Sequence, residues 1–200
     1  TAIPHAWKAG PQTQLLRSQL VALTPGQSVV LTIPLAPYRC PPGPYERVCV
    51  IADWLKANKP GSKIIVLDAN LDIVVEKDNF SKAFTMLYAG IVDYRPASKV
   101  TNIDVDARAV TYEDAVGIPT TEFPGVINAI PPQRAPKLLA DAGLLSADLT
   151  KPFAPVNVLS YESTNPGKSN IHVIGDASLT TQPKAGHIGK QQGKTCADAI

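Results

Sequence analysis

A strand–helix–strand pattern over residues 28–68 constrains the fold most strongly. Residues 28–34 form a continuous aliphatic and β-branched run bounded by turn residues, which predicts a buried strand. Residues 45–57 carry apolar side chains at helical spacing, with Pro44 near the expected first turn. Residues 63–68 form a second buried run that ends in Asp68. This order is typical of a βαβ unit, so we expect an α/β fold.

Further periodic segments extend this pattern. Apolar residues at helical spacing predict helices at residues 12–22, 80–89, 136–142 and 189–200. Short apolar runs predict strands at residues 125–130, 156–160 and 170–176, and the alternation over residues 99–112 predicts short antiparallel strands.

Composition excludes several classes of protein. The chain has 200 residues, of which 44% are hydrophobic and 18% charged, enough for a folded core in one large or two small domains. No apolar run approaches the roughly 18 residues of a membrane-spanning helix. The net charge of +2 is interspersed, so nucleic acid is not an expected partner. Three scattered cysteines and three histidines form no zinc-type cluster, and we expect no metal.

The turn after the first predicted strand lacks the glycine loop that binds a dinucleotide. Residues 35–47 contain one glycine and four prolines, whereas a G-x-G-x-x-G loop lets the backbone approach a pyrophosphate. We therefore expect a domain with the shape of an NAD-binding domain that does not bind NAD.

The same turn places Cys40 and Glu46 six residues apart, after the carboxyl end of a strand, where ligands bind in open α/β sheets. A thiol flanked by Arg39 and Arg47 near a helix N-terminus is a candidate nucleophile for a soft sulfur substrate. The alternative is a buried structural cysteine with Glu46 as a solvated acid in the first helical turn. Cys49 and Cys196 are expected in the core.

A second constellation lies near the C-terminus. Gly175 and Asp176 end a predicted strand, where a carboxylate can meet a ribityl or ribose hydroxyl, and a helix follows residues 182–187. The alternative is an ordinary strand-end turn in which Asp176 caps a helix. The three histidines are expected to be structural; His187 is the most interesting, because it follows Gly186 in a predicted loop before a helix.

Taken together, these segments resemble the flavoprotein subunit of flavocytochrome c sulfide dehydrogenase, a relative of the sulfide:quinone reductases. The matching stretches run in order over the chain: residues 4–10 (PHAWKAG), 39–47 (RCPPGPYER), 62–68 (SKIIVLD), 79–82 (NFSK), 127–134 (INAIPPQR), 172–177 (HVIGDA), 183–186 (PKAG) and 192–194 (QGK).

The resemblance implies roles for particular residues. Cys40 matches one half of a redox-active disulfide against a flavin, where it receives sulfur from sulfide, and Glu46 matches a proposed acid/base residue. The implied cofactor is FAD. The positions that match FAD-binding segments are Gly175 and Asp176, which hold the FAD chain, Lys184, Ala185 and Gly186, which approach the isoalloxazine, and Trp7, whose role stays open.

The sequence departs from the family at the second redox cysteine. The family has a Trp-Cys-Pro-Val segment, whereas this chain has FAPV at residues 153–156, which places Ala154 where the partner thiol belongs. The two-cysteine cycle is therefore in doubt, and a persulfide on Cys40 alone, or another donor, would replace it.

The resemblance also implies a domain organisation and partners. We expect an α/β chain with an FAD-domain-side segment at residues 1–26, a doubly wound NAD-like domain with an antiparallel strand excursion at 27–151, and part of an FAD-binding domain at 152–200. This corresponds to a central portion of the family's chain, which alone is not expected to retain FAD because the family's glycine loop is missing. A c-type cytochrome is the implied partner and the periplasm the implied location. The alternatives are a non-catalytic interaction domain on the same scaffold and a sulfide:quinone reductase-like enzyme.

Overall fold

The computed structural model describes residues 3–200, and the chain divides into two compact units. The first, here called the sheet unit, comprises Thr1–Ala36 and Pro42–Pro131. The second, here called the pocket unit, comprises Pro37–Pro41 and Pro132–Ile200. The chain thus enters the pocket unit twice, first for the five residues around Cys40.

A four-stranded parallel sheet forms the centre of the sheet unit. Its strands are β1 (Ser28–Ile33), β2 (Lys63–Asp68), β3 (Val92–Arg95) and β7 (Val126–Ala129), in the order β3-β2-β1-β7. Every neighbouring pair is parallel. This order corresponds to one half of a doubly wound sheet.

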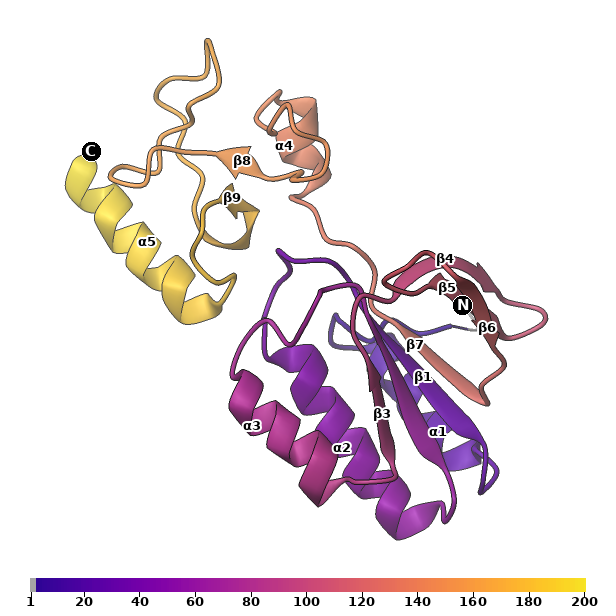
Figure 1. Ribbon diagram of the computed structural model, residues 1–200. Coiled ribbons are helices and arrows are strands. Elements are labelled where there is room, and N and C mark those ends of the chain that lie inside the picture. Colours follow the sequence, from indigo (N-terminus) through magenta and orange to yellow (C-terminus); the bar gives the residue numbers. More distant parts are fainter. Residues whose placement is uncertain (1–2) are drawn as a thin grey trace. The chain divides into compact units, whose positions relative to one another are not determined.

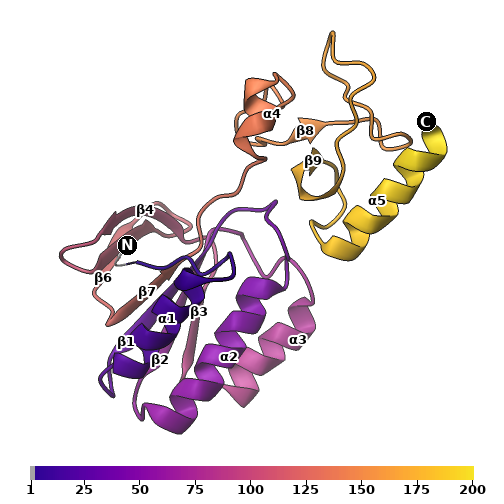
Figure 2. The same cartoon turned by 180° about the vertical axis from the view of Figure 1, so that it is seen from behind.

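Helices α1 (Pro11–Ala22), α2 (Gly43–Asn58) and α3 (Lys77–Lys82) belong to the same unit. Figures 1 and 2 show α2 and α3 packed beside the parallel sheet. Helix α2 turns its buried residues Val48, Ile51, Ala52 and Leu55 inward at helical spacing. A π-helical turn, Ala83–Leu87, continues α3, so the predicted helix at residues 80–89 is formed with two different windings.

An antiparallel sheet is inserted between β3 and β7. Its strands are β4 (Lys99–Asp104), β5 (Ala109–Glu113) and β6 (Pro119–Glu122). Side chains of β5 pack on the parallel sheet in one apolar cluster, which consists of Val30, Ile65, Leu67, Val110, Tyr112 and Ile127. Arg95 on β3 also joins the two sheets, because its guanidinium donates to Glu122 and to the Tyr112 hydroxyl, each at 2.6 Å.

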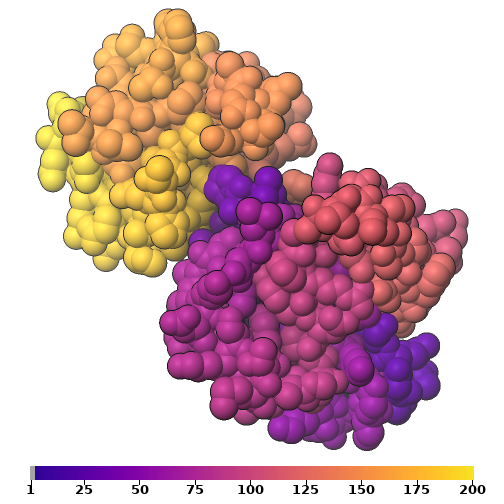
Figure 3. All heavy atoms as spheres, in the orientation of Figure 1, coloured from indigo at the N-terminus to yellow at the C-terminus, as the bar shows by residue number. Residues whose placement is uncertain are grey.

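The pocket unit has little regular structure. It contains α4 (Lys137–Asp141), the two-residue strands β8 (Ala154–Pro155) and β9 (Ser178–Leu179), a 3₁₀ turn at Gly175–Ala177, and α5 (Gly186–Ala199). Figure 3 shows α5, in yellow, along one side of this unit.

The structure confirms the α/β class with its antiparallel excursion and corrects several predicted elements. The strands predicted at residues 156–160 and 170–176 are wrong, because Val156 and His172 form only single bridges, with Ser163 and Glu162. Strands β3 and β6 were not predicted. Helix α5 begins at Gly186, three residues earlier than expected, so His187 lies in a helix and not in a loop.

The compact units divide the chain at residues 131 and 132, where we expected a boundary at 151 and 152. The assignment of residues 1–26 and 152–200 to an FAD-binding domain stays a prediction. Within residues 3–200, no helix combines the length and apolarity needed to cross a bilayer.

Candidate functional site

Hydrogen bonds from two consecutive main-chain N–H groups fix the loop that carries Cys40. The Arg39 N–H donates to Oε1 of Gln133 at 2.9 Å, and the Cys40 N–H donates to the carbonyl of Lys184 at 2.8 Å. Cys40 has a φ of 57°, a left-handed conformation that is uncommon outside glycine. Its side chain is exposed, so the alternative of a buried structural cysteine is wrong. The thiol is thus accessible and sits on a constrained backbone.

The other two cysteines differ from Cys40. All three are free thiols. Cys196 is buried in α5, as predicted, whereas Cys49 on α2 is only half-buried and not a core residue. Burial, followed by the charge of Glu46, raises the pKa of the Cys49 thiol, which lowers its reactivity at neutral pH.

Glu46, Arg47 and Trp7 belong to the sheet unit. Glu46 is exposed in the first turn of α2, the helix end that favours a negative charge. The Arg47 guanidinium donates to the carbonyls of His5 and Ala6, at 3.1 and 2.6 Å, and lies 4.8 Å from the centre of the Trp7 ring. Arg47 thus anchors the N-terminal segment, and its predicted influence on Cys40 stays a prediction, as does the cofactor role of Trp7.

Lys184 is a buried cation in the pocket unit. Its side chain is 6% exposed, and Nζ donates to the carbonyls of Asp176 and Ser178, both at 2.8 Å. The same nitrogen lies 3.8 Å from the centre of the Phe153 ring, in cation–π geometry. Burial lowers the pKa of Lys184 to about 8, against an opposing effect of the Asp176 carboxylate.

The turn that carries Gly175 and Asp176 packs against α5. The Gly175 N–H donates to Oε1 of Gln192 at 2.6 Å, and a Cβ on Gly189 would lie 3.3 Å from the Gly175 Cα. No side chain caps the N-terminus of α5, and a Cβ on Gly186 would meet nothing within 4 Å. This helix end therefore presents unpaired N–H groups beside open space, which suits an electron-rich ligand atom.

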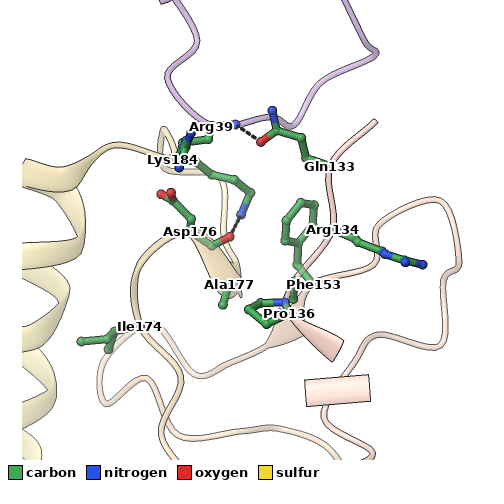
Figure 4. Close-up of a pocket in the computed structure, with 10 residues that line it drawn as sticks. Arg39, Gln133, Arg134, Pro136, Phe153, Ile174, Asp176, Ala177 and Lys184 are labelled. Atoms are coloured by element: carbon green, nitrogen blue, oxygen red, sulfur yellow. Dashed lines mark hydrogen bonds between the residues drawn. The ribbon is translucent and has the colours of Figure 1, made fainter. Parts of the chain in front are cut away.

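A pocket of about 350 Å³ opens beside these groups (Figure 4). Its walls combine the Phe153 ring, Lys184 and Asp176 with Arg39 and Gln133. The structure thus brings together the loop of Cys40, the Gly175–Asp176 turn and the start of α5. Sequence reasoning gave Phe153 and Gln133 no role, because the contacts that place them join segments far apart in sequence. Gln133 lies in a matched stretch, whereas Phe153 begins the segment that departs from the family.

The position where an NAD-binding domain holds a ribose is occupied by the protein itself. Asp68, at the carboxyl end of β2, is fully buried. Its Oδ2 accepts hydrogen bonds from the hydroxyls of Tyr45 and Tyr94, at 2.8 and 2.9 Å, and its Oδ1 accepts two from Asn70. The carboxylate that a ribose would need is used inside the fold. Among residues 3–200, no cluster of three His, Cys, Asp or Glu side chains is arranged to hold a metal ion.

Solved structures share this fold. A chain in the mitochondrial ATP synthase of Tetrahymena thermophila is 17% identical, with a TM-score of 0.66 over 98% of this chain and 47% of that one. The sulfide:quinone oxidoreductase of Aquifex aeolicus is 19% identical, with a TM-score of 0.67 over 94% of this chain and 46% of that one. At these identities the likeness concerns the fold alone, and this chain spans about half the length of either match.

The sequence family is more specific. The model of the central region of the sulfide dehydrogenase (flavocytochrome c) flavoprotein chain matches residues 13–131, more than half of the chain and most of the sheet unit. The protein therefore belongs to the flavocytochrome c sulfide dehydrogenase flavoprotein family.

Proposed function

We propose that this chain is part of an FAD-dependent oxidoreductase that oxidises sulfide to sulfur, with Cys40 as the sulfur-accepting residue. The family supports a flavoprotein that acts on sulfide. The observation that carries the proposal is the exposed Cys40 thiol, held by main-chain bonds next to Lys184 and the α5 N-terminus. A fixed, accessible thiol can form a bond to the sulfur of a small substrate when an electron acceptor removes the electron pair.

The pocket unit fits the ring end of a flavin. It offers an aromatic wall at Phe153, a half-buried carboxylate at Asp176 and the uncapped N-terminus of α5 at Ala185–Gly186. These groups would hold the ribityl chain and the ring, whereas the sequence has no glycine loop for the pyrophosphate. When bound, the flavin accepts a pair of electrons and passes them on singly.

The chemistry at Cys40 balances without a second cysteine. Hydrosulfide and the Cys40 thiol form one S–S bond, which gives a persulfide anion and releases two protons and two electrons. A flavin held by the pocket unit would be the acceptor of this electron pair. Ala154 is fully buried and carries no thiol, so a disulfide between the family's two redox positions cannot form in this chain.

Glu46 is proposed to accept one of these protons. It follows Cys40 by six residues and is a solvent-exposed carboxylate, which exchanges protons rapidly with water. Replacing it with glutamine in Glu46→Gln is expected to slow persulfide formation while leaving the exposure of Cys40 unchanged.

Mass spectrometry of Cys40 after exposure of the FAD-loaded full protein to sulfide tests the proposal. We expect the addition of one sulfur atom at Cys40, with bleaching of the flavin absorbance, and neither change in the Cys40→Ser variant. Cys49, a half-buried thiol of raised pKa, is the internal control and should stay unmodified. An unmodified Cys40 in protein that holds FAD contradicts the assignment.

The two candidate functions differ in the electron acceptor that reoxidises the flavin. A c-type cytochrome is the acceptor that the family name supports. A periplasmic location is proposed from the sequence resemblance alone. The fold shared with a sulfide:quinone oxidoreductase supports a quinone instead. Rapid mixing of the sulfide-reduced protein with cytochrome c or with a water-soluble quinone separates them by the rate of flavin reoxidation. A protein that holds no flavin but still binds a cytochrome would favour a non-catalytic interaction module.

A further inference from the structure

A second pocket lies in the sheet unit, between α1 and α2. It measures about 350 Å³, and its apolar walls come from both helices, through Leu16, Leu20, Val21, Val50, Ile51 and Trp54. Val21 and Val50 are 55% and 69% exposed, so these apolar side chains face open space on the helix surfaces. A small number of polar groups in a mainly apolar cavity of this size is typical of a small-molecule site.

Both charged residues of this groove are arginines. Arg17 on α1 and Arg47 on α2 line it, and no acidic residue among residues 3–200 does so. Arg47 donates only to neutral acceptors, namely the carbonyls of His5 and Ala6 and the amide oxygen of Asn128. Neither guanidinium has a carboxylate within salt-bridge distance in the described part of the chain. The groove therefore has a positive charge without a counter-ion.

The burial of Arg47 strengthens the attraction between its charge and an anion in the groove. Burial lowers the pKa of its guanidinium, because a charge removed from water is stabilised less. An anion that entered the groove would meet Arg47 with little intervening solvent, where a charge pair is stronger than on an open surface. Arg17 lies in the middle of α1 and Arg47 lies near the N-terminus of α2, whereas Val21 and Trp54 lie nearer the C-terminal ends of these helices.

From this arrangement we propose that the groove binds a small amphipathic carboxylate, with its anionic group at Arg17 and Arg47 and its apolar chain along Val21, Val50 and Trp54. A guanidinium binds a carboxylate with good geometry, and the apolar walls bury a chain that water would otherwise solvate. The site lies wholly in the sheet unit and is independent of the chemistry proposed for Cys40.

Tryptophan fluorescence gives a direct readout. The chain has two tryptophans: Trp54 lines the groove, and Trp7 stacks on Arg47. We expect decanoate, titrated into the full chain, to change this fluorescence saturably, with at least tenfold weaker binding of decanol, which has the chain without the charge. Acetate, which has the charge without the chain, should give no saturable change. Raising the ionic strength should weaken decanoate binding.

Two variants locate the site. Arg17→Gln removes one guanidinium from an exposed position, and Val50→Asp places a negative charge on the exposed wall of the groove. Each is expected to weaken decanoate binding at least fivefold. Arg134→Gln removes an equal charge from an exposed residue that does not line the groove, and should leave the affinity within twofold of the wild-type value.

Saturable decanoate binding that both groove variants weaken, and the control does not, supports the proposal. Absence of saturable binding overturns it, as does equal affinity for decanol, or an equal effect of Arg17→Gln and Arg134→Gln. Circular dichroism of each variant establishes that the chain is folded. If Val50→Asp fails to fold, Arg17→Gln, which changes an exposed side chain, decides the question.

Discussion

The sheet unit and the pocket unit differ in what fills their interiors. The centre of the sheet unit is mainly aliphatic, with side chains such as Val29, Leu31 and Val66 that have no solvent exposure, and the polar Asp68 and Asn128 are also fully buried in this unit. The pocket unit contains buried polar side chains, Lys184 and Gln192, that bond to main-chain atoms of neighbouring turns. Apolar burial is non-directional and scales with area, whereas each of these hydrogen bonds has one required geometry.

The difference indicates how each unit responds to change. A parallel sheet with covered faces tolerates conservative substitution so long as volume is kept. A unit with two-residue strands depends on a few polar bonds to place its turns, and losing one partner leaves buried acceptors unpaired. The groups around the pocket, Asp176 among them, are held in this second way. Four experiments test this comparison.

Leu31→Ala should have the largest effect. Leu31 is fully buried in β1, and deleting its side chain leaves a cavity in the sheet, which costs about 2–5 kcal/mol of the free energy of unfolding. Denaturant unfolding, combined with amide exchange to separate the units, measures the loss. Leu35→Ala, at a residue 66% exposed, is the control. A loss below about 1 kcal/mol would show that the sheet relaxes around the cavity.

Lys184→Met should destabilise the pocket unit by about 2 kcal/mol. Methionine keeps the apolar stem against Phe153 but leaves the carbonyls of Asp176 and Ser178 without their donor. Amide exchange at the Gly175–Ala177 turn should rise, while exchange in β1 and β2 stays unchanged. Lys190→Met, at an exposed position of α5, is the control. Unaltered exchange at the turn would mean that the free-energy cost of removing the Lys184 ammonium from water equals the stabilisation from its hydrogen bonds.

Gln192→Leu should cost about 1–2 kcal/mol, again in the pocket unit only. The Gln192 amide accepts from the Gly175 N–H and donates to Oε1 of Gln182 at 2.8 Å, and leucine can do neither. Its neighbour Gln191 is exposed, so Gln191→Leu provides a matched control that should change stability by less than about 0.5 kcal/mol. Equal effects of the two substitutions would argue against the assigned role of the buried amide.

The fourth experiment measures a pH dependence instead of a mutational loss. The pKa of Lys184 is about 8 in the folded chain and about 10.4 when unfolded, so the unfolded state binds more protons between these values. The stability of the pocket unit should therefore rise as pH increases from about 8 to about 10.4. The wild-type protein should show this slope relative to Lys184→Met in unfolding experiments across that range. Parallel pH profiles of the two proteins would contradict the assignment.

The sequence predicted the sheet unit far better than the pocket unit. The strands at residues 28–33 and 63–68 and the helix between them gave clear periodic signals, because each buries a continuous apolar run or stripe. Strand β3 escaped prediction because all four of its residues are only half-buried, and β6 because its residues are mostly exposed. In both cases pairing with a neighbouring strand, which sequence patterns do not reveal, decides the structure.

The errors in the pocket unit have a different cause. Residues 156–160 were predicted as a strand, but Asn157 and Ser160 turn the chain: the Asn157 side chain accepts from the Leu159 N–H, and the Ser160 carbonyl accepts from the ring of His172. Such side-chain bonds compete with strand pairing and outweigh a short apolar signal. For the candidate site, the matched motifs named Cys40, Asp176 and Lys184, whereas Phe153 and Gln133 emerged only with the contacts.

By itself, the sequence determined the parallel βαβ core, the absence of a dinucleotide glycine loop and the alanine at position 154, because each depends on residue type and local spacing. Only the tertiary structure decided that Cys40 is exposed on a left-handed backbone with its N–H bonded to the Lys184 carbonyl. Only the tertiary structure decided, too, that Arg17 and Arg47 line one groove, which no acidic residue among residues 3–200 lines. The physical reason is the separation in sequence between the residues that make contact. Periodicity within one segment indicates which of its faces is buried, whereas a hydrogen bond or a pocket depends on which distant segment covers that face.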